Sequence, residues 1–355
     1  MGDGWCTCPT TSTRTPGVRV GPHAPSAPAL LRQDGRVRLR YPDVPLKAGH
    51  YESVYAALVH PDAPRALWVR TTVKKRPGEE PTGAVWVTWF DEDGVRAGKL
   101  DDQALSAAPD RLTCGPAAQG PDGSRGAIGL DGLSADWDLS FSSRAEPLEH
   151  LSPAFLYGAP LPRTKATSPA PDLGVTGTLV VDGAAVDLTG WTGMVGHNWG
   201  SEHAARWVWL RVCGLGADGA GWLDAVLGRV QVGPGLLPWK AFGALHLDGK
   251  RHHLGGLLRR GTDVEVRPDG ARIGLVGPTA RVTVSATAPL TSTVGWEYAD
   301  PSGHRHEVVN CSVAAMELEA EVDGRRTSYT PTRRGVLELG ADEKQLDVPL
   351  QPFAD

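Results

Sequence analysis

The chain has 355 residues, a hydrophobic content of 41%, a charged content of 22% and a formal net charge of −5. The length exceeds the size at which a single core stops growing, so it predicts two packed domains of ordinary globular composition. The acidic balance offers no basic stripe for nucleic acid, and the sequence has no run of 18 apolar residues that would predict a membrane span.

The first 28 residues are rich in Pro, Thr and Ser, and we expect a disordered leader there. They lack the apolar stretch of a signal peptide, and Cys6 departs from the myristoylation pattern. The five cysteines, of which Cys6 and Cys8 lie in the leader, include no CxxC pair, so neither a disulfide framework nor a zinc site is indicated. A reducing cytoplasm is the predicted compartment.

From residue 36 onward, short segments with alternating apolar and polar side chains predict half-buried strands. Asp-Gly pairs separate several of these segments and favour tight hairpin turns, because they tolerate positive φ. These pairs stand at 93–94, 182–183, 248–249, 269–270 and 323–324. The predicted strands are 36–41, 53–60, 66–74, 84–90, 135–142, 177–181, 207–213, 222–232, 241–247, 263–267, 271–276, 281–287, 294–298 and 307–322.

A Pro-rich segment, 146–172, interrupts the strand pattern and is the predicted seam between the two domains. Each side has enough strands for a barrel, and no long segment has helical spacing free of Gly and Pro. The predicted fold class is therefore all-β, with two antiparallel β-barrels in tandem over 29–150 and 151–355.

The segment 190–211, GWTGMVGHNWGSEHAARWVWLR, contains four of the 12 tryptophans, although the chain has only 5 Phe and 6 Tyr. Strand alternation places Trp207, Trp209 and Arg211 on one face. These side chains either plug a barrel end or, as we favour, form the wall of a ligand cavity together with Trp199 and Trp222.

Three polar residues near these tryptophans are candidates for the chemistry of such a cavity. His197 lies in a Gly-rich segment interpreted as a loop, and it either moves a proton near neutral pH or braces the turn. Asn198 either donates to an oxyanion or bonds the backbone of the turn. Glu202 either forms an ion pair with a nearby arginine or acts as an acid whose pKa the indoles raise.

Other motifs favour structural interpretations. His304 and His306 follow a turn signal and have no third ligand at a diagnostic spacing, so we expect no metal. The GxGxxG match at 214–219 precedes a predicted strand instead of a helix and indicates a hairpin loop. P-loop, GxSxG and HExxH patterns are absent from the sequence, so it gives no support for the corresponding enzyme classes.

The segment 194–200, MVGHNWG, followed by Glu202 and His203, resembles the hydroxyneurosporene synthase (carotenoid 1,2-hydratase)-like and AttH-like superfamily, which has relatives among tocopherol cyclases and lipocalin-like Diels–Alderases. YESVY at 51–55 and LPRTK at 161–165 match as well. The resemblance implies two tandem lipocalin-like (calycin) β-barrels that hold a hydrophobic ligand near their junction and need no cofactor.

The resemblance also maps a catalytic or binding role onto His197, Asn198 and Trp199, and onto Glu52. Hydratase-like members carry an acidic residue directly before His-Asn-Trp-Gly, whereas this chain has Gly196 there. If that acid protonates an alkene, Glu202 or Glu52 replaces it here, or the chain does not perform hydration.

Two hypotheses follow for the function. The first is a cofactor-independent enzyme that hydrates, isomerises or cyclises a terpenoid, polyene or polyketide, with tryptophan faces stabilising cationic character. The second is a lipocalin-like carrier or sensor, which needs no ionisable group facing its ligand. A filled barrel with a structural role is the third, and the sequence leaves the ligand, the reaction and the oligomeric state open.

Overall fold

A computed structural model describes residues 1–2, 4, 37–331 and 334–352. The chain divides into residues 1–32 and a second unit of residues 33–355, and the following description concerns the second unit. Nearly all of the predicted leader, with Cys6 and Cys8, lies outside the described residues.

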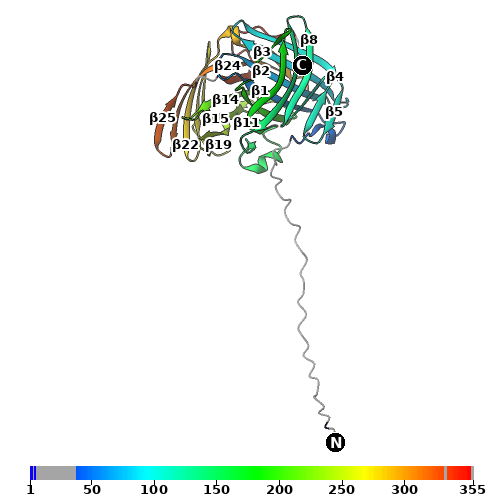
Figure 1. Ribbon diagram of the computed structural model, residues 1–355, viewed down its shortest axis with the longest axis vertical. Coiled ribbons are helices and arrows are strands. Elements are labelled where there is room, and N and C mark those ends of the chain that lie inside the picture. The colour runs from blue at the N-terminus through cyan, green and yellow to red at the C-terminus, as the bar shows by residue number, and fades with distance from the viewer. Residues whose placement is uncertain (3, 5–36, 332–333, 353–355) are drawn as a thin grey trace. The chain divides into compact units, whose positions relative to one another are not determined.

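Among the described residues the strands form a 13-stranded antiparallel sheet, an 11-stranded antiparallel sheet and one small hairpin. The first sheet is a nearly closed barrel and the second is a half-barrel, so the predicted all-β class with tandem lipocalin-like barrels is confirmed (Figure 1). Three short 3-10 helices accompany the described strands: η1 (Tyr41–Asp43), η2 (Ala154–Tyr157) and η3 (Leu290–Ser292).

The first sheet has the order β4-β3-β2-β1-β13-β11-β9-β8-β7-β6-β5, with β10 and β12 paired to β11. Its strands are β1 (His50–Val59), β2 (Ala66–Lys75), β3 (Thr82–Asp91), β4 (Gly94–Gln103), β5 (Leu105–Ala108), β6 (Arg111–Cys114), β7 (Ala117–Gly120), β8 (Gly123–Leu130), β9 (Leu133–Ser143), β10 (Leu148–Glu149), β11 (Thr164–Val181), β12 (Ala184–Ala185) and β13 (Thr192–Gly200).

The second sheet has the order β19-β18-β15-β14-β26-β24-β22-β21-β20, with β23 and β25 paired to β24. Its strands are β14 (Arg206–Leu215), β15 (Gly221–Arg229), β18 (Lys240–Leu247), β19 (Lys250–Gly255), β20 (Asp263–Arg267), β21 (Gly270–Val276), β22 (Ala280–Thr287), β23 (Val294–Ala299), β24 (Arg305–Val322), β25 (Arg325–Tyr329) and β26 (Gly335–Ala341). The separate hairpin joins β16 (Gln231–Val232) to β17 (Gly235–Leu236).

The hairpin turns follow the predicted chemistry. Asp182, Asp248 and Asp323 have φ of 48°, 49° and 49°, and the glycine after each has a positive φ as well, as a type I′ turn requires. The GxGxxG segment connects β14 to the antiparallel β15, so it is the expected hairpin loop.

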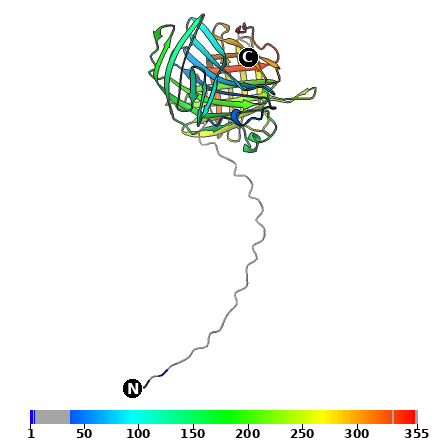
Figure 2. The ribbon, with the colours of Figure 1, turned by 90° about the vertical axis from the view of Figure 1, so that its right-hand side faces the viewer.

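Alternation along β1 and β2 separates two cores. Val54, Leu58 and Val69 point into the first barrel, whereas Tyr55 and Trp68 point outward and share a core with the second sheet. Figure 2 shows the cyan-to-green strands of the first sheet curving beside the yellow-to-red strands of the second. The outer face of the first barrel is therefore an inner wall of the protein.

The Pro-rich segment leads into the first sheet. β11 runs through Pro169 and Pro171, and its register with β13 shifts between Thr167 and Leu173, where bulges accommodate residues that cannot donate to the ladder. β13, which ends at Gly200, is the last strand of the first sheet along the chain, and β14 begins the second sheet. The boundary between the sheets therefore lies after Gly200, whereas the predicted domains meet at residue 150.

The search for membrane-spanning helices found none of sufficient length and apolarity in the described part of the chain. Cys114, Cys213 and Cys311 are buried.

Candidate functional site

A cavity of about 830 Å³ lies between the outer face of the first barrel and the second sheet. This volume is typical of a site for a small organic ligand. Aromatic rings from both sheets line it: Tyr55, Trp68, Trp207, Trp209, Trp239, Phe242 and Tyr298. Among these rings stand four polar groups that define the site, namely Arg70, Asn198, His203 and Glu338.

Glu338 lies in the middle of the second sheet, opposite Trp209 of β14 on one side and Asn310 of β24 on the other. Trp207 Nε1 donates to its Oε1 at 3.1 Å, and Asn310 Nδ2 donates to its Oε2 at 3.2 Å. The side chain is only 8% exposed. Burial raises the pKa of this carboxyl despite the charge of Arg70 and these hydrogen bonds, so the protonated form is favoured to higher pH than usual.

Arg70 of β2 stands directly opposite Tyr55 of β1, and the strand pleat turns both toward the cavity. Its Nε donates to Ser53 Oγ at 2.8 Å, and its guanidinium carbon lies 4.2 Å from the ring centroid of Tyr298. Arg70 is 4% exposed, and its Nη1 has no hydrogen-bond partner. The cavity wall therefore holds a buried cation that the protein satisfies incompletely.

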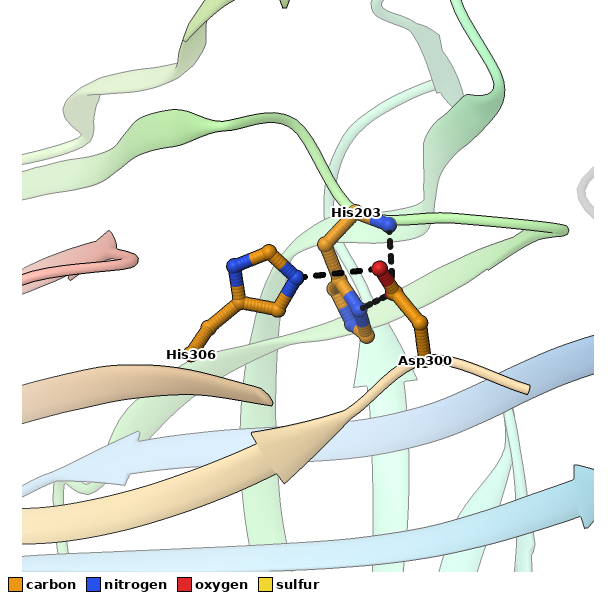
Figure 3. A group of neighbouring side chains, drawn as sticks. All are labelled: His203, Asp300 and His306. Atoms are coloured by element: carbon orange, nitrogen blue, oxygen red, sulfur yellow. Dashed lines mark hydrogen bonds and ion pairs between the residues drawn. The ribbon is translucent and has the colours of Figure 1, made fainter. Parts of the chain in front are cut away.

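His203 and Asp300 form an imidazole–carboxylate dyad beside this cation (Figure 3). His203 Nδ1 lies 2.7 Å from Asp300 Oδ1, which also accepts from the His203 backbone N–H at 2.7 Å. His306 Nε2 lies 3.1 Å from the other carboxylate oxygen. Burial acts to raise the pKa of Asp300, but hydrogen bonds from the two histidines outweigh it and hold the pKa well below its usual range.

An ionised Asp300 places the proton of neutral His203 on Nδ1 and leaves the lone pair on Nε2, which has no partner in the structure. Burial lowers the pKa of His203 against the pull of Asp300, so the neutral base is favoured. The ring is held between Tyr51 and Trp207, with centroid distances of 4.0 and 5.4 Å. Such an oriented imidazole is suited to accept a proton.

Two groups of residues in this region have nitrogen and oxygen donors within 4.8 Å of one another, a spacing compatible with a cation. They are His203 with Asp300 and His306, and His304 with His306 and Asp342. In the first group the contacts to Asp300 are hydrogen bonds that already use the facing imidazole nitrogens. The arrangement is therefore fully explained by a carboxylate that orients two imidazoles.

Three of the residues predicted from the sequence line the cavity: Asn198, Trp207 and Trp209. Trp209 Nε1 donates to the buried Asp224 at 3.0 Å, and the ring meets Tyr55 edge-on at 5.0 Å. Asn198 Oδ1 is buried and has no partner. The predicted alternation of β14 thus places two indoles on the cavity side.

Glu52, His197 and Trp199 lie on the opposite side of the sheet, facing the interior of the first barrel. The segment around His197 is part of β13 and not a loop, so neighbouring residues alternate and only Asn198 faces the cavity. His197 Nε2 lies 2.7 Å from Glu52 Oε1, and both side chains are fully buried. The His197 ring stacks on Trp199 at 4.7 Å.

Glu52 is a structural anion at this position. It accepts the backbone N–H groups of Arg40 and Tyr41 at 2.8–3.0 Å. Burial acts to raise its pKa, but the hydrogen bonds from His197, His50 and Tyr41 prevail and lower the pKa to about 2. A carboxylate held ionised in this way braces the strand ends and is a poor proton donor.

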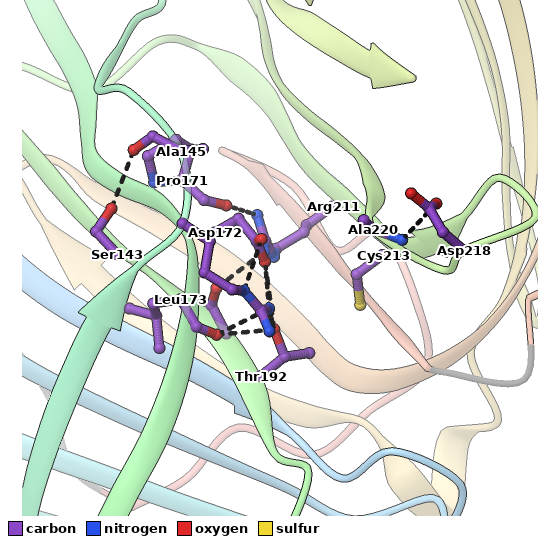
Figure 4. A network of polar contacts seen from close by, with 12 residues as sticks. Ser143, Ala145, Pro171, Asp172, Leu173, Thr192, Arg211, Cys213, Asp218 and Ala220 are labelled. Carbon is purple, nitrogen blue, oxygen red and sulfur yellow. Dashed lines mark hydrogen bonds and ion pairs between the residues drawn. The ribbon is translucent and has the colours of Figure 1, made fainter. Parts of the chain in front are cut away.

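The remaining predicted residues also lie outside the cavity wall. Glu202 is 38% exposed and forms an ion pair with Arg163. Trp222 is buried and stacks on His246 at 5.5 Å. Arg211 donates from β14 to the carbonyls of Pro171 at 2.6 Å and Gly193 at 3.0 Å, so it ties the second sheet to the first (Figure 4).

Sterics explain why Gly196 stands where the hydratase pattern has an acidic residue. Gly196 pairs with Tyr55, and a Cβ on Gly196 would lie 2.1 Å from the ring of Tyr55. No side chain fits there while Tyr55 forms the cavity wall. The buried carboxyl of the cavity comes from Glu338 instead, which the motif around His197 could not indicate.

No family model matches the chain. Its curated relatives include the uncharacterized proteins MT0513 and Rv0493c of two Mycobacterium tuberculosis strains, each 30% identical over 301 residues, which are 82% of this chain and 87% of the relative. The chain belongs to the same family as these two mycobacterial proteins.

Solved structures of other proteins share the fold of this chain at low sequence identity. A protein described as AttH from Nitrosomonas europaea has a TM-score of 0.51 at 14% identity, with 90% of this chain and 98% of that chain covered. CghA, crystallised with Sch210972, has a TM-score of 0.52 at 13% identity, with 83% and 90% covered. At these identities the likeness concerns the fold alone.

Proposed function

We propose that this protein binds a lipophilic small molecule of terpenoid, polyene or polyketide type between its two barrels and catalyses a cofactor-independent hydration, isomerisation or cyclisation. The observation that carries the proposal is Glu338, a buried carboxyl in the wall of an aromatic cavity, together with the oriented base His203. The fold shared with AttH and CghA, the latter with Sch210972 bound, supports membership of the hydroxyneurosporene synthase-like and AttH-like superfamily.

In a hydration, Glu338 transfers its proton to one carbon of an alkene, and the π electrons form the new C–H bond. The positive charge that develops on the other carbon faces the indoles of Trp207 and Trp209 and the ring of Tyr298, which stabilise cations through their π faces. A water molecule attacks this carbon while His203 Nε2 accepts its proton. Solvent then returns the proton from His203 to Glu338, and the catalyst is restored.

The same groups perform isomerisation or cyclisation if no water attacks the cation. His203 then removes a proton from a neighbouring carbon, or an internal alkene attacks and closes a ring. Glu338 and His203 thus take opposite roles, an acid and a base whose environments favour the protonated and the neutral form respectively. Glu52, His197 and Glu202 have no part in the step, because they do not line the cavity.

A non-catalytic carrier or sensor is the second candidate function. The aromatic lining favours it equally, since a carrier needs the same apolar volume. Reducing cytoplasm is the compartment we propose, on the basis of the buried thiols of Cys114 and Cys311.

The first test is organic extraction of the purified protein and mass spectrometry of the extract. We expect a lipophile in near-stoichiometric amount, or, if the protein is empty, quenching of tryptophan fluorescence by added dodecanol. Absence of both would contradict ligand binding in this cavity.

The second test separates enzyme from carrier. The extracted compound is incubated with the protein in D₂O, and its mass is followed. An enzyme delivers deuterium to carbon, so the mass of the product increases, and Glu338→Gln abolishes this gain; the matched control Glu202→Gln does not. A carrier leaves the mass unchanged with every variant.

A further inference from the structure

The guanidinium of Arg70 is a buried charged group of the cavity wall, and its Nη1 has no hydrogen-bond partner among the described residues. Among the residues that the structure describes, Ser53 Oγ is the one acceptor of a hydrogen bond from it, and no carboxylate lies within ion-pair distance. A buried charge without a partner lowers the stability of the folded protein, so its presence in the cavity wall points to a ligand group that pairs with it when bound. We propose that Arg70 binds the carboxylate of an otherwise apolar ligand, which makes the ligand of this cavity an amphipathic acid.

The orientation of the guanidinium fits this role. The bond from Nε to Ser53 at 2.8 Å and the stack over Tyr298 at 4.2 Å fix its plane. Among the described residues Nη1 has no hydrogen-bond partner, and the paired N–H donors of a guanidinium match the two oxygens of a carboxylate. Trp68 and Trp86 flank the cation with centroids at 5.8 and 5.5 Å, so the charge is screened little by water.

The other charged groups of the wall agree with an anion at this position. Burial raises the pKa of Glu338, so its carboxyl repels a ligand carboxylate less than an ordinary glutamate would. Burial lowers the pKa of His203, so the neutral imidazole is favoured and adds no charge beside Arg70. Arg70 has no carboxylate partner among the described residues, and the carboxylate of an acidic ligand would neutralise its charge.

The rest of the cavity is suited to the apolar body of the same ligand. Leu156, Val208, Leu227 and Phe242 line it beyond the aromatic rings near Arg70. The ligand is therefore anchored at one end and surrounded by apolar side chains along its length. This inference rests on the proposed binding function but not on the proposed catalysis.

The test compares dodecanoate with dodecanol, which share one flexible chain and differ in the head group. Binding to the full-length protein is followed at neutral pH by tryptophan fluorescence and calorimetry. We expect dodecanoate to bind about tenfold to a hundredfold more tightly than dodecanol, as for a charge-assisted hydrogen-bonded pair. Arg70→Met should abolish this preference and leave the affinity for dodecanol within about twofold.

Arg259 provides the matched control, because it is an exposed arginine that lines the same cavity. Arg259→Met should keep the preference for dodecanoate. If Arg70→Met does not fold, Arg70→Lys retains the charge without the planar edge and should lose at least about threefold of the preference.

The outcomes separate the two proposals. Equal affinity of the wild-type protein for both compounds, or a preference that is lost in Arg259→Met and kept in Arg70→Met, overturns the carboxylate site while binding in the cavity stands. If neither compound binds, the proposed binding function fails and the inference fails with it.

Discussion

Replacement of Glu338 by Gln tests whether the cavity holds a protonatable acid, and it requires no knowledge of the substrate. Gln has nearly the same shape, keeps an oxygen for Trp207 or Asn310, and cannot ionise. Its amide nitrogen faces one of these two donors, and the mismatch costs about 1–3 kcal/mol of unfolding free energy at every pH. The informative quantity is therefore the pH dependence of the difference between wild type and variant.

The direction follows from the raised pKa of Glu338. At a pH below the unfolded value of about 4.5, the carboxyl is protonated in both the folded and the unfolded states. As the pH rises past this value, the unfolded chain releases the proton first, so the folded wild type loses stability until the pH exceeds the folded pKa. Each pH unit by which the pKa is raised corresponds to about 1.4 kcal/mol.

Thermal denaturation of both proteins between pH 4 and 8 measures this difference. The wild-type melting temperature should fall relative to that of Glu338→Gln as the pH rises, by about 2 °C for each kcal/mol. Glu202→Gln should show no such trend, since Glu202 is half-exposed and paired with Arg163. A wild type that gains stability over the variant with rising pH would mean that Glu338 is an ionised partner of Arg70, which refutes its role as an acid.

Two further predictions concern Glu52 and Asp300. Glu52→Gln should lower the unfolding free energy by about 3 kcal/mol at neutral pH, because the pKa is lowered from 4.5 to about 2, and the loss should shrink as the pH falls from 4.5 to 2 in chemical denaturation; unchanged stability at neutral pH would contradict the bracing role. Asp300→Asn should slow deuterium delivery about a hundredfold, since it removes the anion that orients His203, while dodecanol affinity stays within about twofold; an unaltered rate would exclude His203 as the base.

The sequence predicted those features of the fold that are encoded locally. Period-two patterns mark half of the described strands, and the Asp-Gly pairs at 182–183, 248–249 and 323–324 form the expected turns. The strand predicted at 36–41 is wrong: residues 37–40 form no strand, and Tyr41, which a proline follows directly, begins a 3-10 helix. Only the end of β11, at 177–181, was predicted, because the prolines at 169 and 171 suggest a linker, although bulges let the strand continue through them.

The site was predicted in part for the same reason. Trp207 and Trp209 line the cavity as predicted, since alternation within one strand is a local property, and Asn198 lines it too, although from a strand where a loop was expected. Glu338 becomes part of the site only because β26 pairs with β14, a contact between residues more than a hundred positions apart. No local pattern distinguishes Glu338 from an exposed glutamate between two leucines, and Arg70 likewise depends on which sheet covers the outer face of β2.

The conspicuous motif and the chemical groups of the cavity thus lie on opposite sides of one wall. His197 and Trp199 belong to β13, and inside the first barrel His197 forms a hydrogen bond with Glu52 of β1 and stacks on Trp199. The outer face of the same two strands contributes Tyr55 and Asn198 to the cavity. The contacts inside the first barrel hold β1 and β13 in place, and they thereby fix the position of the side chains that the same two strands present to the cavity. Mutations in the motif are therefore expected to act on the cavity through the positions of Tyr55 and Asn198, and not through a lost catalytic group.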